Sequence, residues 1–165
     1  MSDVLKKLES FGHLLLRQIR EGKYPKVSYP KRSLSNIEFK GYLRLKKELA
    51  TRSLGDLGEL RRFSQIIYIA GILKDIIESG NYASQRDVFY IAKIPVHGTR
   101  RLLVEKQEES NDAIVDLELI LEEVRDRLHV LSDSKGVVVG ELKVKSGADV
   151  IDCSRMGQGG WSIPP

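Results

Sequence analysis

The 165-residue chain has a single cysteine, Cys153, and no apolar stretch close to the roughly 20 residues that span a bilayer. One cysteine excludes an intramolecular disulfide, as is usual for proteins kept in a reducing compartment. The first residues lack the basic segment and the long apolar segment of a signal peptide. We therefore expect a cytosolic or nuclear protein with no membrane contact.

Several kinds of catalytic site are also missing from the sequence. The three histidines, His13, His97 and His129, are scattered, so no Cys/His cluster has zinc-binding spacing. The glycine-rich run 157–160 lacks the lysine of a P-loop and no helix follows it, which excludes an ATP site of that type. Nothing near Cys153 would activate a thiol, so we interpret it as a packed strand residue.

Charge is distributed unevenly along the chain. Residues 1–62 contain 15 Lys and Arg against 7 Asp and Glu, a net +8, whereas residues 63–128 contain 8 against 12, a net −4. Residues 129–165 are balanced at 4 against 4. A basic first third suits binding to nucleic acid or docking on an acidic partner, and charge alone does not choose between them.

The first 58 residues are expected to form an arm and a linker with no core of their own. Residues 3–21 have the apolar spacing of an amphipathic helix, and the leucines at 14–16 widen its apolar face. That surplus suits either docking on a partner or covering the core of the same chain. Residues 23–40 are expected to be extended, since Pro25 and Pro30 exclude a central strand.

The rest of the chain has the order of a winged helix-turn-helix. Helices are predicted over 59–79, 84–93 and 111–128, and the apolar period then changes to two over 137–153, which predicts a β-hairpin. We expect an α+β, mostly helical fold, in which a winged-helix domain over 59–156 uses this hairpin as its wing. An amino-terminal helix and an extended arm precede the domain, and a Gly-rich and Pro tail over 157–165 follows it.

The second predicted helix carries the strongest chemical signal. Ser84 and Asp87 have capping-box spacing, so the helix should begin there. Arg86 and Tyr90 then share one face, with Lys93 a further three residues along. A phenol flanked by two cations suits attack on a phosphate, although a surface tyrosine on a basic helix would look the same. The alternative is that Arg86 is a structural partner of an acid such as Asp87 or Asp75.

DNA contacts are not expected from the third predicted helix. Its many acids would repel phosphates, and we expect them to form a solvated face rather than a metal site. A winged helix used only for protein contact remains an alternative. If the domain binds DNA, the contacts should come from the second helix, the following loop and the wing, at Arg86, Lys93, Arg100, Arg101, Lys135, Lys143 and Lys145.

Five segments in the same order and spacing resemble the amino-terminal part of the A subunit of archaeal DNA topoisomerase VI, a family related to the meiotic protein that makes programmed double-strand breaks. The segments are Pro30–Ile37, Arg86–Tyr90, Glu108–Glu118, Ile151–Cys153 and Gly157–Pro165.

The resemblance implies that Tyr90 is the nucleophile of a type IIB topoisomerase. Family members often have two adjacent tyrosines where this chain has Phe89 and Tyr90, and a phenylalanine cannot attack. The implied reaction is a transesterification that links the tyrosine to a 5′-phosphate and is reversed by religation. A free tyrosine has a pKa of about 10. Arg86, one turn away, is therefore expected to assist as a cation beside the phenolate and the phosphate.

The resemblance also implies cofactors and partners. In the family, Mg²⁺ is held by a Toprim domain, which we expect to follow the junction at Pro164 and Pro165, so no metal ligand is assigned to this chain. ATP is bound by a separate B-type ATPase protein, and two A subunits form a homodimer on double-stranded DNA. The region expected to dock on the B subunit includes Leu14, Leu15, Leu16, Arg32 and Asn36.

We therefore expect part of an ATP-dependent type II DNA topoisomerase that makes transient double-strand breaks, and that is inactive as an isolated chain. Its location would be the cytoplasm, with the nucleoid, in an archaeon, or the nucleus in a eukaryote. The alternative is a non-catalytic winged-helix DNA-binding or adaptor protein derived from the same family.

Overall fold

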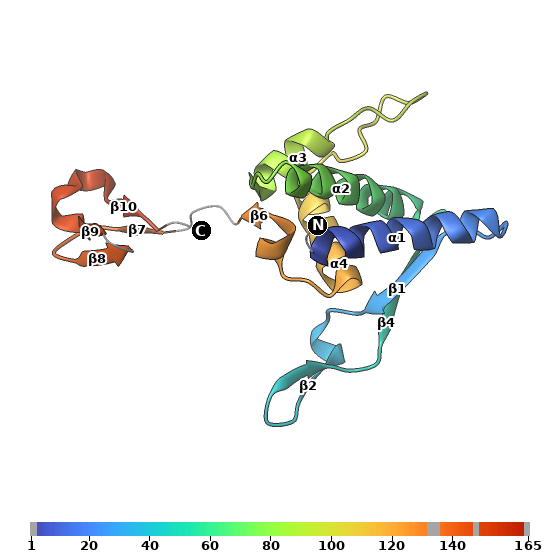
Figure 1. Ribbon diagram of the computed structural model, residues 1–165, viewed down its shortest axis with the longest axis horizontal. Coiled ribbons are helices and arrows are strands. Elements are labelled where there is room, and N and C mark those ends of the chain that lie inside the picture. Colours follow the sequence, from blue (N-terminus) through green and yellow to red (C-terminus); the bar gives the residue numbers. More distant parts are fainter. Residues whose placement is uncertain (1–2, 132–135, 147–148, 164–165) are drawn as a thin grey trace. The chain divides into compact units, whose positions relative to one another are not determined.

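The computed structural model describes residues 3–131, 136–146 and 149–163. The chain forms two compact units, residues 1–130 and 131–165, and each is described by itself (Figure 1). The sequence placed its boundaries after residues 58 and 156, so the structure divides the chain differently. The amino-terminal arm belongs to the same unit as the helices, because its strand side chains pack into their core.

Helix α2 (Leu60–Glu78) is the centre of the first unit. It contacts α1 (Asp3–Arg20), α3 (Gln85–Ala92) and α4 (Gln107–Leu121). The first three helices begin and end within one residue of the sequence prediction, which is thereby confirmed. The side chains that are completely buried between α2 and α4 are Phe63, Ile66, Ile69, Leu73, Ile114 and Leu117.

The third predicted helix, 111–128, has different bounds. Helix α4 begins at Gln107 because the Glu109 carboxylate accepts the backbone N–H groups of Glu105 at 2.6 Å and Lys106 at 3.2 Å. It ends at Leu121, since Glu122 is left-handed with φ +51°, and the chain continues as the 3₁₀ turn η2 (Arg125–Leu128). Leu121 and Leu128 are both buried, so buried leucines recur at helical spacing on both sides of the helix end. For this reason apolar spacing alone predicted one continuous helix.

The arm is a pair of antiparallel ladders. Strand β1 (Lys26–Pro30) pairs with β4 (Leu49–Ser53), and β2 (Ile37–Phe39) pairs with β3 (Leu43–Leu45). Along β1, Val27 and Tyr29 are buried in the helical core and alternate with exposed residues. The predicted extended arm therefore has an ordered strand structure anchored on the helices.

Asn36, in the 3₁₀ turn η1 (Leu34–Asn36), fixes the root of the β2–β3 hairpin. Its Nδ2 donates to the carbonyls of Lys31 at 2.6 Å and Glu48 at 3.0 Å, and its Oδ1 accepts the Glu48 N–H at 3.1 Å. The side chain is completely buried. Because both the donor and the acceptor of the Asn36 amide bond the backbone of the same chain, its role is structural.

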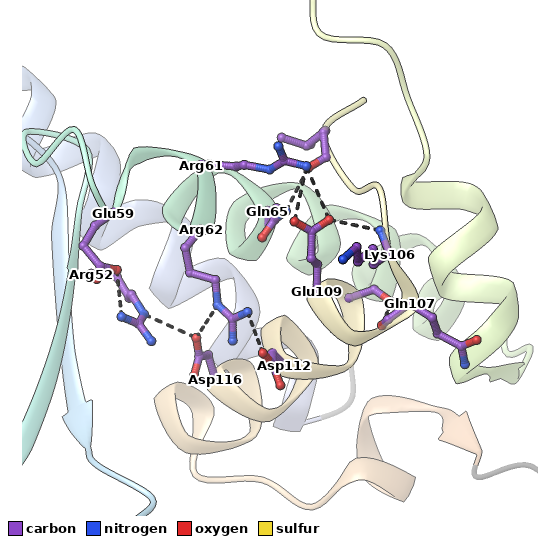
Figure 2. A network of polar contacts seen from close by, with 12 residues as sticks. Arg52, Glu59, Arg61, Arg62, Gln65, Lys106, Gln107, Glu109, Asp112 and Asp116 are labelled. Carbon is purple, nitrogen blue, oxygen red and sulfur yellow. Dashed lines mark hydrogen bonds and ion pairs between the residues drawn. The ribbon is translucent and has the colours of Figure 1, made fainter. Parts of the chain in front are cut away.

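Asp116 of α4 joins the arm to the helices (Figure 2). Its Oδ2 accepts from Nε of Arg62 on α2 at 2.9 Å and lies 3.4 Å from Nε of Arg52 on β4. Arg52 also reaches Glu59 at 2.7 Å, and Arg62 reaches Asp112 at 3.2 Å. The Asp116 side chain is only 10% exposed. One buried carboxylate thus compensates guanidinium groups from two other elements.

Two further acids of this region are covered by basic residues. Glu123, whose side chain is 3% exposed, pairs with Lys7 of α1 at 2.7 Å and with Arg127 at 3.1 Å. Glu118 pairs with Arg125 at 2.7 Å. The prediction of a solvated acidic face is therefore wrong for Asp116, Glu118 and Glu123.

Residues 131–165 form the second unit. Strand β7 (Val137–Val138) pairs with β10 (Trp161–Ser162), and β8 (Lys143–Ser146) pairs with β9 (Asp149–Asp152). The 3₁₀ turns η3 (Cys153–Arg155) and η4 (Gly157–Gly159) lie between β9 and β10. Cys153 is free and buried, as expected of a packed residue. At Gly160, with φ +62°, a Cβ would lie 2.7 Å from the Val138 carbonyl oxygen, so only glycine fits.

The fold class is α+β, as predicted, with helices accompanied by small two-stranded sheets. The predicted hairpin is present as β8–β9, but it belongs to the second unit. No helix in the described ranges is long and apolar enough to cross a membrane.

Replacing Asp116 by Asn should lower the free energy of unfolding by about 2 kcal/mol, because two partly buried guanidinium groups lose a shared anion. Asp112→Asn is the matched control: its carboxylate is 67% exposed and contacts only Arg62, so the expected loss is below about 0.5 kcal/mol. Urea unfolding measures both. Equal midpoints for the two variants would contradict a central role for Asp116.

Candidate functional site

Helix α3 starts at a complete capping box. Ser84 Oγ accepts the Asp87 N–H at 3.1 Å, and Asp87 Oδ2 accepts the Ser84 N–H at 2.9 Å and its hydroxyl at 2.8 Å. These hydrogen bonds, first from the Ser84 backbone and then from its side chain, lower the pKa of Asp87. The capping role predicted for Asp87 is confirmed, and this carboxylate is engaged at the helix start.

His129 holds the turn that precedes α3. Its Nδ1 lies 2.7 Å from the Asn81 carbonyl oxygen, and its ring stacks on Tyr82 with centroids 4.2 Å apart and planes 9° apart. Its own carbonyl accepts the Ala83 N–H at 3.0 Å. Strand β5 (Ala83–Ser84) also pairs with β6 (Val130–Leu131). The start of α3 is therefore fixed by the segment that follows α4.

The two faces of α3 differ sharply. Val88 and Ala92 are completely buried in the helical core, and Phe89 packs against it. Arg86 and Tyr90, four residues apart, lie on the exposed side, and Tyr90 is 58% exposed. The adjacent rings of Phe89 and Tyr90 are tilted by 48° with centroids 5.2 Å apart. The shared exposed face predicted for Arg86 and Tyr90 is thus present, with the hydroxyl-bearing ring on the solvent side.

Arg86 forms no ion pair or side-chain hydrogen bond within the part of the chain that the structure describes. The acid next to it, Asp87, bonds Ser84 instead. The alternative in which Arg86 serves as the structural partner of Asp87 or Asp75 therefore gains no support. A guanidinium group that makes no such contact within the fold is available to bind an anion from outside the chain.

Further cations follow α3 along the chain. The Lys93 ammonium lies 5.5 Å from the centroid of the Phe89 ring. Beyond it the chain doubles back: Pro95 bridges to Leu102, and the Val96 N–H bonds the Arg101 carbonyl at 2.9 Å. Gly98 has φ +76° at the tip of this loop. Arg100 and Arg101 are both exposed there.

Comparison with known proteins identifies the family. A model of type IIB DNA topoisomerases matches residues 61–130, and a model of the all-β domain in the DNA topoisomerase VI alpha subunit matches residues 135–165. The two matches follow the two compact units. The chain belongs to the type IIB DNA topoisomerase family.

Several relatives are named as the A subunit of type 2 DNA topoisomerase 6. The chain is 34% identical over 164 residues to the protein of Pyrococcus abyssi, covering 98% of this chain and 43% of the relative. It is 36% identical over 161 residues to the Sulfurisphaera tokodaii protein, covering 92% and 42%. With the Methanothermobacter thermautotrophicus protein, identity is 31% over 165 residues, covering 98% and 45%. The chain thus spans less than half the length of these relatives.

The family match bears on the predicted wing. The β8–β9 hairpin lies in residues 135–165, which match the all-β domain. It lies outside residues 61–130, which match the type IIB DNA topoisomerase model and contain α2, α3 and α4. Lys143 and Lys145 on β8 are exposed in this second unit. Lys135, the third predicted wing lysine, lies outside the described residues. Sequence reasoning had attached the hairpin to the helices because it saw only the order of elements.

The residues predicted to dock on a topoisomerase B subunit have different environments. Leu15 is 7% exposed in the chain's own core, so α1 covers that core, while Leu14 is half-buried and Leu16 is 49% exposed. Arg32 is exposed and lies 3.9 Å from Glu118. Asn36 is buried and fully hydrogen-bonded, and Leu15 is packed inside, so neither is accessible to a partner.

No group of three or more His, Cys, Asp or Glu in the described ranges could hold a metal ion. Glu109, Asp112, Asp116 and Glu118 of α4 pair with arginines instead. Sequence reasoning also missed His129, whose link to the turn before α3 has no signal in spacing or composition, since the contacting residues are 48 positions apart.

Asp87→Asn should lower the free energy of unfolding at neutral pH by about 1 kcal/mol, because a neutral amide at N3 of the capping box accepts the Ser84 hydrogen bonds less strongly than a carboxylate does. Because the folded pKa of Asp87 is lowered, its stabilisation is present above the unfolded value of about 3.9 and is lost as pH falls through the folded pKa. The difference between variant and wild type should therefore shrink on acidification below about pH 4.

The control for this pH series is Asp75→Asn, which changes an exposed acid of α2 and should leave stability unchanged. Thermal unfolding followed over a pH series tests the prediction. A constant difference between Asp87→Asn and wild type at every pH would contradict the capping account.

Proposed function

We propose that this chain belongs to the DNA-cleaving part of the A subunit of a type IIB topoisomerase, with Tyr90 as its nucleophile. The proposal rests on the different environments of Phe89 and Tyr90 on α3. Phe89 packs on the core, whereas the Tyr90 ring is 58% exposed and lies one turn from an arginine without a partner in the described chain. The helix lies in the segment that matches the family.

The reaction is a transesterification. The Tyr90 hydroxyl loses its proton, its oxygen forms a bond to the phosphorus, and the bond from phosphorus to the 3′-oxygen breaks. The departing 3′-oxygen takes up a proton, and the tyrosine stays linked to the 5′-phosphate. Because the phosphodiester energy is kept in the new bond, attack by the 3′-hydroxyl reverses the step without a ligation cofactor.

Arg86 would act on the same phosphate. A guanidinium beside the reacting group stabilises charge that develops on the phosphate oxygens and on the phenolate. In the folded chain it has no competing carboxylate among the described residues, since Asp87 is held by Ser84. Arg86 is therefore the proposed electrostatic partner of Tyr90.

Exposed cations in each of the two units would contact the duplex. Lys93, Arg100 and Arg101 are exposed along α3 and the loop that follows it, and Lys143 and Lys145 are exposed in the second unit. The acids of α4 and of the segment after it oppose DNA less than the sequence suggests, because Asp116, Glu118 and Glu123 are compensated by cations of the chain. Such contacts would make binding sensitive to salt.

The described residues do not fit a magnesium site, since Glu109, Asp112, Asp116 and Glu118 of α4 pair with arginines and no group of three or more His, Cys, Asp or Glu among them could hold a metal ion. The Mg²⁺ expected for the family would be held by a Toprim domain outside these residues, and ATP would be used by the B subunit. For this reason the chain alone should bind DNA weakly and should not cut it.

The proposed assembly places this chain in an A-subunit homodimer that docks on the B-type ATPase to relax or decatenate DNA. Leu16 of α1 is an accessible apolar contact for that ATPase, together with the exposed Arg32. The place of action would be the cytoplasm with its nucleoid in an archaeon, or the nucleus in a eukaryote.

Tyr90→Phe removes only the attacking oxygen and should abolish covalent adducts. The chain, or this variant, is combined with a Toprim-containing polypeptide of the family, a B subunit, Mg²⁺, ATP and supercoiled DNA. Wild type should give 5′-linked protein–DNA adducts on denaturing gels, and Tyr90→Phe should give none while binding DNA equally well. Tyr68→Phe, which removes a hydroxyl from α2 on a ring 36% exposed, is the control and should retain adduct formation.

Three outcomes would overturn parts of the proposal. Adducts formed by Tyr90→Phe would move the nucleophile elsewhere. Binding without adducts in both proteins would favour the non-catalytic DNA-binding or adaptor interpretation. Mg²⁺-dependent cleavage by the chain alone would contradict the need for a Toprim domain.

A further inference from the structure

Several basic residues of the first third are used inside the fold. Lys7, Arg52, Arg61 and Arg62 each pair with acids of α4 or of the segment just after it. Residues 31–48, here named the arm hairpin, lie between β1 and β4 and contain six Lys and Arg against two Glu. Their net charge, 6 − 2 = +4, equals the +4 of the whole chain. Half of the +8 of residues 1–62 therefore lies in one short segment.

The acids within the arm hairpin are already in use. Glu48 pairs with Lys31 at 2.7 Å. Glu38 pairs with Arg44 across the β2–β3 ladder and lies 3.9 Å from Lys40. Both carboxylates are thus matched, and Arg32 lies 3.9 Å from Glu118 of α4. Lys46 and Lys47 are the arm hairpin cations that have no acidic partner in the described chain. The Lys46 ammonium bonds only the Ser35 carbonyl at 2.8 Å, and Lys47 has no side-chain polar partner in the described chain.

The tip of the arm hairpin exposes two aromatic rings. Phe39 is 73% exposed and Tyr42 is 64% exposed, on either side of a turn in which Gly41 has φ +77°. The β2–β3 ladder extends away from the helices (Figure 1), and the buried Asn36 amide holds its root. Since a two-stranded hairpin is marginal by itself in water, exposed rings and like charges here contribute little to the fold and suit contact with another molecule.

We propose that the arm hairpin binds the backbone of duplex DNA as a contact separate from α3, an inference that rests on the proposed function of the chain. The surplus cations complement phosphate charge. A two-stranded β-ribbon has the dimensions that the major groove admits. The exposed rings would lie against sugars and base edges, while Lys46 and Lys47 at the root would contact phosphates.

The test compares two double variants of the full chain by fluorescence anisotropy with a short labelled duplex over a salt series. Lys46→Gln with Lys47→Gln removes two cations of the arm hairpin. Lys6→Gln with Arg20→Gln removes two exposed cations of α1 that have no polar side-chain partner in the described chain, so both variants change the net charge equally. Matching urea midpoints with wild type establish that the variants fold.

The slope of log affinity against log salt should fall by about 0.9 for each lost phosphate contact, hence by about 1.8 for the arm hairpin variant and by about zero for the α1 control. Equal slopes for the two variants would overturn the arm hairpin contact and would point to an acidic protein as its partner. Binding by wild type with no salt dependence would overturn the DNA-binding part of the proposed function as well. A normal wild-type slope with an unchanged arm hairpin variant overturns only this inference.

Discussion

The position of the arm depends on one buried anion, Asp116. Its carboxylate lies between Arg62 of α2 and Arg52 of β4, so three elements meet at a single charge. Tyr29 of β1 is buried close by, and burial together with the Asp116 charge raises its pKa. The hydroxyl therefore stays protonated beside the carboxylate. Without Asp116, Arg52 and Arg62 would lose their shared anion in a partly buried site. Among the described residues, ion pairs would then attach the arm only at Glu59 and Glu118.

This arrangement changes what the charge of the sequence means. The +8 of residues 1–62 is not all available to a partner, because part of it compensates α4 and the segment after it. Conversely, the acids of α4 are not an unscreened negative face. Cations without acidic partners in the described chain lie on α1, on α3, on the loop that follows α3 and on the arm hairpin. The fold thus has two sets of basic residues. One set pairs with acids of the same chain, and the other is exposed and suited to bind an anionic polymer.

The sequence predicted the features that depend on local rules. Apolar spacing located α1 and α2, and Ser84 with Asp87 located the start of α3, because both signals lie within a few residues. It failed in two ways. The start of α4, set by Glu109, and its end at the left-handed Glu122 are local features that apolar spacing does not reveal. The pairing of Asp116 with Arg62 and of Glu123 with Lys7 joins residues 54 and 116 positions apart. The sequence predicted that Tyr90 lies on an exposed face of α3. It did not predict that His129 contacts Asn81 and Tyr82 in the turn before α3.

The central claim is that the exposed hydroxyl of Tyr90 is the atom that attacks DNA. The chain has six tyrosines, and trypsin would release Tyr90 alone within residues 87–93, between Arg86 and Lys93. Mass spectrometry of a nuclease-treated, trypsin-digested adduct from the assembled complex identifies the modified residue. The account predicts a 5′-linked nucleotide on Tyr90 in the 87–93 peptide. A nucleotide on any other tyrosine of the chain, with that peptide unmodified, would contradict it.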